Sequence, residues 1–146
     1  MALPTVHASG WCYTWGMAAV GGTNICLDAS IIYNLIKRHN VTHICGAPVV
    51  LNMLVSNSLT NEHLERPVQF LASGAPLPAS LLLRAESLGF RVSHCYGLTE
   101  TAGFVVSCAW KPQWNTLAAS ERTRLRARQG VRTIGLMEMD VVDPDS

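Results

Sequence analysis

The run Arg91-Val92-Ser93-His94-Cys95-Tyr96-Gly97-Leu98-Thr99-Glu100-Thr101 decides our interpretation of the fold. Its first part, Arg91–Cys95, predicts a short strand, and the hexapeptide Tyr96–Thr101 comes where that strand should end. Open α/β sheets bind ligands at the carboxyl ends of their parallel strands. There, an aromatic ring can stack on a base, a glycine admits a ligand to the backbone, a hydroxyl can bond a phosphate, and a carboxylate can hold Mg²⁺. The alternative is a loop whose threonine and glutamate only cap the next element.

Around this run, predicted strands alternate with predicted helices. Strands are expected at Thr23–Leu27, His43–Cys45, Val68–Ala72, Arg91–Cys95, Gly103–Cys108 and Ile134–Val142. Helices are expected at Trp11–Val20, Ala29–His39 with Asp28 as its N-cap, Val49–Val55, the segment between Pro78 and Gly89, and Leu117–Arg128. Such alternation is typical of a parallel sheet with right-handed crossovers. We therefore predict an α/β fold: part of a doubly wound, mainly parallel sheet flanked by helices.

Composition limits the class of protein. The chain has 146 residues, 49% hydrophobic and 14% charged, which allows at most one ordinary domain and is rich in apolar residues. Either a membrane segment or an interior slice of a larger protein fits this balance. Met1–Leu27 lacks charged residues, but Pro4, His7 and several glycines interrupt every run of about 18 apolar residues. We expect no membrane span, and no signal peptide because a basic n-region and a cleavage site are lacking. The net charge of +1 gives no reason to expect nucleic-acid binding.

The cysteine and histidine spacing argues against a disulfide framework or a zinc site. The five cysteines form no C-x-x-C pair, which favours a reducing, intracellular compartment. His39 and His43 are four residues apart, but Asn40 and Val41 between them indicate a helix end and a strand start, so the two rings need not share a face.

The basic segment near the end of the chain predicts a solvated surface helix. Its arginines alternate, at positions Arg122, Arg124, Arg126 and Arg128. A spacing of two residues separates helical side chains by about 200°, so they do not form one face. An RNA- or lipid-binding patch is the less favoured alternative.

Two motifs together resemble those of the acyl-adenylate-forming ligases, the AMP-dependent synthetase/ligase superfamily. They are the hexapeptide Tyr96–Thr101 and the segment Ser73-Gly74-Ala75-Pro76-Leu77-Pro78. Longer phrases resemble plant acyl-activating enzymes of the benzoate- and medium-chain-acyl-CoA ligase kind: Trp15–Asn24, Cys45–Leu54, Leu82–Phe90 and Arg128–Thr133. The resemblance spans nearly the whole chain.

The resemblance implies a chemistry and a set of ligands. Members join a carboxylic acid to the α-phosphate of ATP, release pyrophosphate and pass the acyl group to coenzyme A. The implied ligands are ATP, Mg²⁺, coenzyme A and a small aromatic or short- to medium-chain carboxylic acid.

The resemblance also implies roles for particular residues. By position, Gly74, Ala75 and Pro76 would line the adenine with backbone, and Tyr96 would stack on it. Thr99 would bond the α-phosphate and Glu100 would hold Mg²⁺. His7, in Val6-His7 where the family usually has Phe-His, would lie beside the acyl carboxylate; the ordinary alternative is a turn histidine. Trp11 and Gly97 would form walls of the acyl pocket.

Three departures from the family pattern lead us to expect a partial AMP-binding domain over residues 1–146. The family's phosphate loop lies upstream of the segment matching Met1, and its ribose-binding aspartate and C-terminal lid with a catalytic lysine lie downstream. The connection at Leu27-Asp28-Ala29 is also shorter than relatives usually carry. Because adenylation needs phosphates, metal and carboxylate held in one geometry, we expect no useful ligase activity from this chain alone.

The residues leave three hypotheses open. The first is a fragment of an acyl-CoA ligase, and the second is a non-catalytic remnant that binds nucleotide weakly or associates through uncovered sheet faces. The third is an unrelated α/β domain that shares the hexapeptide by chance. The family implies a cytoplasmic or peroxisomal location, and Pro144-Asp145-Ser146 is not a peroxisomal signal.

Overall fold

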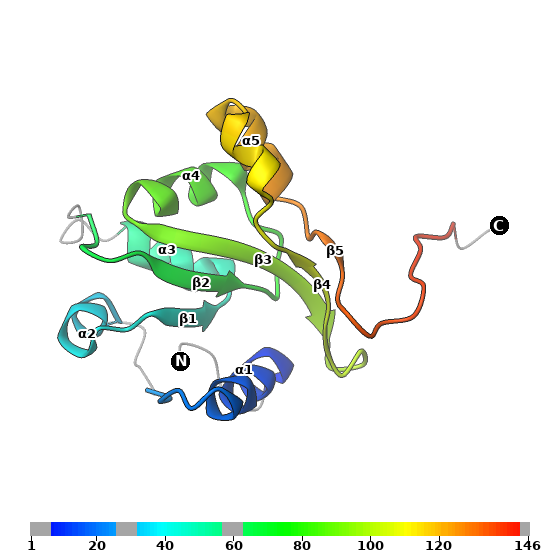
Figure 1. Cartoon of the computed structure of the whole chain (residues 1–146), viewed down its shortest axis with the longest axis horizontal. Helices are drawn as coiled ribbons and strands as arrows, with labels where there is room; N and C mark the ends of the chain where they lie inside the picture. The colour runs from blue at the N-terminus through cyan, green and yellow to red at the C-terminus, as the bar shows by residue number, and fades with distance from the viewer. Residues whose placement is uncertain (1–6, 26–31, 57–62, 144–146) are drawn as a thin grey trace.

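A mixed five-stranded sheet forms the centre of the molecule (Figure 1). The computed structural model describes residues 7–25, 32–56 and 63–143. The strands are β1 (His43–Gly46), β2 (Val68–Ala72), β3 (Phe90–Leu98), β4 (Gly103–Cys108) and β5 (Val131–Arg132), side by side in that order. The first three strands are parallel, whereas β4 and β5 add antiparallel pairs at one edge. The α/β prediction is confirmed, with the parallel arrangement limited to β1–β3.

Helices connect and cover the strands. They are α1 (Ala8–Ala19), α2 (Ile32–His39), α3 (Pro48–Ser56), α4 (Ala79–Ser87) and α5 (Ala119–Arg126), with a short 3-10 helix at Pro112–Thr116. α3 and α4 pack together, α1 contacts β1 and β4, and α5 lies against α4 (Figure 1). Each parallel strand is therefore joined to the next by a helix, as the sequence pattern predicted. Of the described helices, not one has the length and apolar character needed to cross a membrane.

The hydrophobic core lies between the parallel strands and the helices α2, α3 and α4. β2 and β3 alternate buried with less buried side chains, so Phe70 and Phe90 point into the core and meet edge-to-face, with ring centroids 6.3 Å apart. Leu82 and Ala85 of α4 are fully buried in the same cluster. This period of two is what half-covered strands require, because successive side chains point to opposite faces.

Two predicted strands differ from the structure. Ile134–Val142 is not a strand: β5 ends at Arg132, and the side chains of Ile134 and Val141 are exposed. Gly135, at φ +92°, lies in a conformation that interrupts an extended chain, so apolar content alone did not make a strand here. Of the strand predicted at Thr23–Leu27, the residues up to Ile25 are irregular and the remainder lies outside the described residues.

The predicted helices are confirmed with shifted ends. The predicted Ala29–His39 helix is described from Ile32 onward, so its start and the proposed Asp28 cap lie outside the described residues. α4 begins directly after Pro78, whose fixed φ suits a helix start. Gly89, at φ +97°, comes just after its end, as expected for a residue that closes a helix.

Candidate functional site

The hexapeptide forms the end of β3 and the turn into β4. The sequence predicted that the strand would stop at Cys95, but β3 continues through Leu98 because β4 pairs with it, with Tyr96 opposite Val106 and Leu98 opposite Gly103. Thr99 and Glu100 lie in the turn, which is closed by a hydrogen bond from the Ala102 amide to the Thr99 carbonyl (3.1 Å). The candidate site is therefore a hairpin tip.

The two threonines of the hexapeptide have different environments. The Leu98 amide donates to Oγ1 of Thr101 at 2.8 Å, and the same hydroxyl lies 3.0 Å from the Leu98 carbonyl oxygen and 2.9 Å from that of Gly103. Thr101 is therefore committed to holding the hairpin. Thr99 is exposed, which leaves it as the threonine placed to contact a ligand.

Gly97 occupies a place where no side chain fits. The strand register shifts between Tyr96 and Gly97, and a Cβ at Gly97 would lie 2.0 Å from the Gly103 carbonyl oxygen. The two backbones of the hairpin meet at this point. This contact explains the glycine by itself, and the acyl-wall role of Gly97 stays a prediction.

The structure brings Gly74–Pro76 beside Tyr96. In the parallel register the last residue of β2, Ala72, lies opposite His94. Gly74 follows the end of β2 by two residues, and Tyr96 lies two residues beyond His94 on β3, so both come at the same end of the sheet. Gly74 has φ +91°, a conformation that favours glycine, and it turns the chain directly after the buried Ser73. Gly74, Ala75, Pro76 and Tyr96 are all exposed. The predicted adenine-lining residues therefore converge at the same end of the sheet as Thr99 and Glu100.

His7 and Trp11 come from the start of α1, which packs against β4. The Sγ atom of Cys12 lies 3.1 Å from the position that a Cβ on Gly103 would occupy, so this helix reaches the hairpin directly beside its turn. The carbonyl of His7 accepts the Trp11 amide at 2.9 Å, and the His7 side chain is exposed. Trp11 is 58% exposed and packs edge-on against Trp15. Its indole is thus on an open surface, and the acyl-site roles of both residues stay predictions.

Glu100 offers one exposed carboxylate at the hairpin tip. The described residues contain no group of three or more histidine, cysteine, aspartate or glutamate side chains placed to hold a metal. Mg²⁺ is commonly bound through one or two carboxylates together with substrate phosphates and water. The tip therefore fits an ion that arrives with a nucleotide.

Two buried cysteines, Cys45 and Cys95, have thiols that are poor nucleophiles. Cys95, directly before Tyr96, is buried, and burial raises the pKa of its thiol. Burial also raises the pKa of the Cys45 thiol to about 12. Both are protonated near neutral pH, and only the thiolate attacks an electrophile.

A cavity beside the amino halves of β2 and β3 lies away from the hexapeptide. Its volume is about 610 Å³, and it is lined by residues that include Gln69, Arg91, Trp110, Arg122 and Arg126. Gln69 and Arg91 belong to the amino halves of β2 and β3, so the cavity and the hairpin lie at opposite ends of β3. The candidate site at the hexapeptide is therefore identified by its converging polar and backbone groups and not by a cavity.

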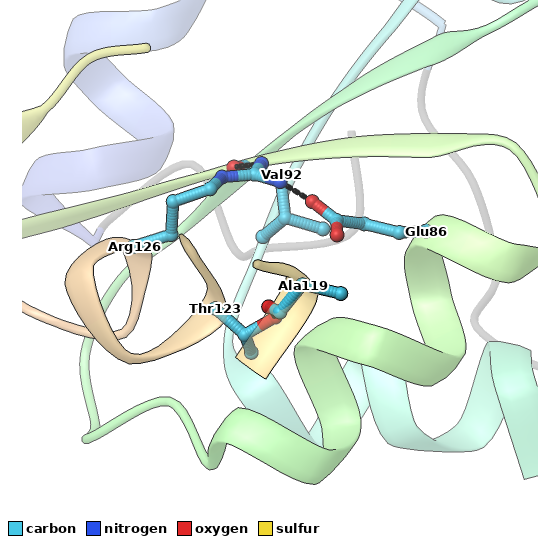
Figure 2. A network of polar contacts seen from close by, with 5 residues as sticks. All are labelled: Glu86, Val92, Ala119, Thr123 and Arg126. Carbon is cyan, nitrogen blue, oxygen red and sulfur yellow. Dashed lines mark hydrogen bonds and ion pairs between the residues drawn. The ribbon is translucent and has the colours of Figure 1, made fainter. Parts of the chain in front are cut away.

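Sequence reasoning missed the role of Arg126. The prediction of a solvated arginine helix is wrong at this position, because Arg126 is only 9% exposed. Its guanidinium donates to the Val92 carbonyl and forms an ion pair with Glu86 of α4 (Figure 2). The guanidinium carbon also lies 4.9 Å from the Trp110 ring centroid. At Val92, β3 is paired with β2 on one side, but β4 begins to pair with it only at His94, so Arg126 satisfies a carbonyl on the edge that β4 leaves uncovered. The alternate spacing of the arginines in the sequence did not indicate that Arg126 would make these contacts.

His94 was missed as well. Its side chain is 2% exposed, and its two ring nitrogens face backbone carbonyls: Nδ1 lies 3.0 Å from the Ala127 oxygen and Nε2 3.3 Å from the Ala75 oxygen. In the sequence, His94 is one residue of a predicted strand, and nothing there indicates that its ring contacts two distant carbonyls.

Comparison with known proteins agrees with the geometry. The model of the AMP-binding enzyme family matches residues 1–146. The chain is 68% identical over 149 residues to a probable peroxisomal acyl-activating enzyme 5 of Arabidopsis thaliana, covering 99% of this chain and 26% of that protein. It is 65% identical over 145 residues to a 2-methylpropanoate–CoA ligase of Humulus lupulus, covering 97% and 26%. The chain thus spans about a quarter of the length of these relatives.

Solved structures give the same result. O-succinylbenzoate coenzyme A synthetase of Bacillus subtilis, in complex with ATP and magnesium ion, matches with a TM-score of 0.64 and 31% identity over 75% of this chain and 23% of that one. The N-terminal domain of FACL13 from Mycobacterium tuberculosis shares the fold, with a TM-score of 0.71 over 92% of this chain and 33% of that one. The chain belongs to the AMP-binding enzyme family, and the hypothesis of an unrelated domain is wrong.

Proposed function

We propose that this chain contributes the adenylate-forming site of an acyl-CoA ligase that activates a small aromatic or short- to medium-chain carboxylic acid. The observation that carries the proposal is the convergence of the Gly74–Pro76 turn with the Tyr96–Glu100 hairpin at one end of neighbouring strands. Support comes from relatives named as CoA ligases, one of them for 2-methylpropanoate.

Each group has a definite task in this reaction. The backbone of Gly74–Pro76 and the ring of Tyr96 hold the adenine between them. A carboxylate oxygen of the acid bonds to the α-phosphorus of ATP, the bond to the bridging oxygen of the β-phosphate breaks, and pyrophosphate leaves. Thr99 donates a hydrogen bond to the α-phosphate, and His7 lies beside the acyl carboxylate. Glu100 holds Mg²⁺, which neutralises charge that develops on the phosphates.

The second half-reaction consumes the acyl adenylate. The thiolate of coenzyme A bonds to the acyl carbon, and AMP leaves with the electron pair of the broken acyl–phosphate bond. Residues 1–146 are proposed to act as part of an AMP-binding domain that holds nucleotide without turning over by itself. The physical reason is that Thr99 and Glu100 are exposed to water, whereas phosphoryl chemistry is accelerated by fixed donors in a water-excluded site. A cytoplasmic or peroxisomal location is part of the proposal.

Calorimetric titration of the chain with ATP, with and without Mg²⁺, tests the nucleotide site. We expect Mg²⁺ to tighten ATP binding in the unsubstituted chain and in Glu121→Gln, an exposed control on α5. In Glu100→Gln, the tightening should vanish. An Mg²⁺ effect of unchanged size in Glu100→Gln would contradict the assignment.

Chemistry is tested in a chimera in which residues 1–146 replace the matching segment of the Humulus lupulus ligase. Acid-dependent ATP–pyrophosphate exchange should fall about 10²-fold in Thr99→Ala, the scale of losing one fixed donor to a developing oxyanion. Thr116→Ala, remote from the hairpin, is the matched control. Exchange that persists unchanged in Thr99→Ala would refute the role of this hydroxyl. Robust exchange by the unsubstituted 146-residue chain would refute the proposal that it does not turn over.

A non-catalytic role in association is the second candidate. It is favoured by large apolar side chains on open surfaces, since Trp11 and Trp15 of α1 are 58% and 60% exposed. Patches of this kind commonly mark interaction sites. Light scattering across a concentration series tests the candidate: self-association lost in Trp15→Ser supports it, and a monomer at every concentration counts against pairing between copies.

A further inference from the structure

We propose that His94 is a positioning residue of the nucleotide site, which fixes the Ala75 carbonyl in the turn that lines the adenine. This inference rests on the proposed function, because it assigns a task to that same turn. His94 itself is 2% exposed and so lies beneath the surface that a nucleotide would contact. It acts through the turn and has no direct contact with ligand.

The contacts of the His94 ring define its task. Nε2 lies 3.3 Å from the Ala75 oxygen and Nδ1 lies 3.0 Å from the Ala127 oxygen. Carbonyl oxygens only accept hydrogen bonds, so the ring meets either one by donating. A neutral imidazole carries one N–H and therefore donates to one of the two carbonyls. The proposal places that hydrogen on Nε2, which donates to Ala75, while the close contact of Nδ1 with the Ala127 oxygen limits how far the ring can turn.

The turn needs such a contact because its own residues are exposed. The Ser73 amide donates to the Gly46 carbonyl at 3.3 Å, which fixes the start of the turn, and Leu77 is buried and fixes its end. Between these two points Gly74, Ala75 and Pro76 face solvent, and Gly74 has φ +91°. The hydrogen bond from His94 ties the middle of the turn to β3, the strand that also carries Tyr96. Both predicted walls of the adenine site therefore share one strand as their support.

The end of α5 supports His94 from the other side. Arg126 donates to the Val92 carbonyl and pairs with Glu86 (Figure 2), and the next residue, Ala127, presents its carbonyl to His94. Consecutive residues at this end of α5 thus contact β3 at Val92 and at His94. A catalytic or binding geometry is precise only when the groups behind it are themselves held. α5 is in this way connected to the adenine-lining turn without approaching the nucleotide.

Two amide substitutions separate the two contacts. The side-chain nitrogen of His94→Gln can occupy the place of Nε2 and keep the donor to Ala75, whereas that of His94→Asn can occupy only the place of Nδ1, facing Ala127, and leaves Ala75 without a donor. His43→Asn, on the exposed start of β1, is the matched control. For each 146-residue variant, calorimetry would give the Kd for ATP and for inorganic tripolyphosphate, both with Mg²⁺, and circular dichroism would give the folded fraction.

We expect the Kd for ATP to rise about three- to tenfold in His94→Asn, the range of one net hydrogen bond, while the Kd for tripolyphosphate is unchanged. His94→Gln and His43→Asn should bind both ligands like the unsubstituted chain. A positioning role predicts that His94→Asn weakens binding of ATP but not of tripolyphosphate, and that His94→Gln binds ATP normally. A merely structural role does not predict this pattern.

Each contrary result has a definite meaning. If folded His94→Asn binds ATP as tightly as the unsubstituted chain, or loses ATP and tripolyphosphate equally, the positioning role is refuted and the proposed function stands. If His94→Asn does not fold, His94→Gln decides, because a folded His94→Gln that has lost ATP binding refutes the role as well. If the unsubstituted chain binds tripolyphosphate but not ATP, or binds neither, the proposed function fails and the positioning role fails with it.

Discussion

The two halves of β3 have different surroundings. In the amino half, Phe90 and Val92 are buried in the core, the strand pairs in parallel with β2, and Arg126 covers a carbonyl that lacks a strand partner. In the carboxyl half, Tyr96 and Leu98 are exposed, the strand pairs with β4, and the hairpin ends in an open turn.

In the proposed function, one strand would both stabilise the fold and carry groups that bind the nucleotide. The amino half holds the buried side chains and the hydrogen bond from Arg126. Removing one of these groups would leave its packing or hydrogen-bond partners without a contact. The carboxyl half contributes little to the core and exposes a ring, a hydroxyl and a carboxylate. Substitutions should therefore separate into those that lower stability and those that lower ligand binding, according to their half of β3.

The largest expected effect comes from removing the buried arginine. Arg126→Met should lower the free energy of unfolding by about 3 kcal/mol, because it leaves the Glu86 carboxylate and the Val92 carbonyl without their partner. Arg124→Met, exposed on the same helix, should change it by less than about 0.5 kcal/mol. Urea denaturation measures both. Equal effects from the two substitutions would show that the α5 contact contributes nothing special to the amino half.

Gly97→Ala should have the next largest effect and lower the free energy of unfolding by about 2 kcal/mol. It tests the close approach of the two hairpin strands in the carboxyl half of β3. An added Cβ would lie 2.0 Å from the Gly103 carbonyl oxygen, so the hairpin backbones must move apart. Gly16→Ala in α1 is the matched control: an added Cβ meets nothing within 4 Å there. Alanine is also the better helix former, by about 1 kcal/mol. Denaturation curves should therefore shift in opposite directions, and a neutral Gly97→Ala would contradict the close approach.

Buried thiols should make the fold sensitive to alkaline pH. Burial raises the pKa of Cys45 to about 12 and raises that of Cys95 as well. The unfolded chain ionises these thiols at lower pH than the folded chain does, so stability is fully present below their ordinary pKa and is lost as pH rises toward the folded value. Each such thiol contributes a slope of at most about 1.4 kcal/mol per pH unit. Urea midpoints between pH 8 and 10.5 should fall, and should fall less steeply in Cys45→Ala; an identical slope in that variant would contradict the pKa shift.

The smallest stability effect distinguishes the two threonines of the hairpin. Thr101→Val removes a hydroxyl that bonds the Leu98 amide, and should lower the free energy of unfolding by about 1 kcal/mol. Thr99→Val should change stability by less than about 0.5 kcal/mol but weaken ATP binding. Thermal unfolding together with ATP titration measures both properties. A Thr99→Val variant that unfolds more readily than Thr101→Val would reverse our assignment.

Elements that depend on local pattern were predictable from the sequence, whereas those that depend on tertiary contact were not. β2 was predicted with its observed bounds, Val68–Ala72, and the helix α4 was recognisable from its apolar face and from Gly89 just after its end. The convergence of Gly74–Pro76 with Tyr96 was predictable, because ends of neighbouring parallel strands meet at one edge of a sheet. The length of β3 was not predictable, because its last three residues belong to the strand only through their pairing with β4.

The buried polar contacts show the limit most clearly. Arg126 and His94 bond to backbone carbonyls of segments at least 19 residues away in sequence. No periodicity encodes which arginine of an alternating set will be buried, since that depends on where the edge of β3 lacks a partner. At Ile134–Val142 the apolar pattern suggested a strand. In the structure, the residues that pair with β4 are Val131 and Arg132 of β5, which precede this segment.

The most direct test of where the nucleotide binds is a map of amide chemical shifts in the ¹⁵N-labelled chain during titration with Mg²⁺ and ATP. The assignment to the carboxyl half of β3 predicts the largest shifts at Gly74, Ala75 and Tyr96–Glu100, with little change at Arg91, Trp110 and Arg122. Shifts concentrated instead at those last three residues would place the nucleotide in the 610 Å³ cavity beside the amino half, and would contradict the central claim.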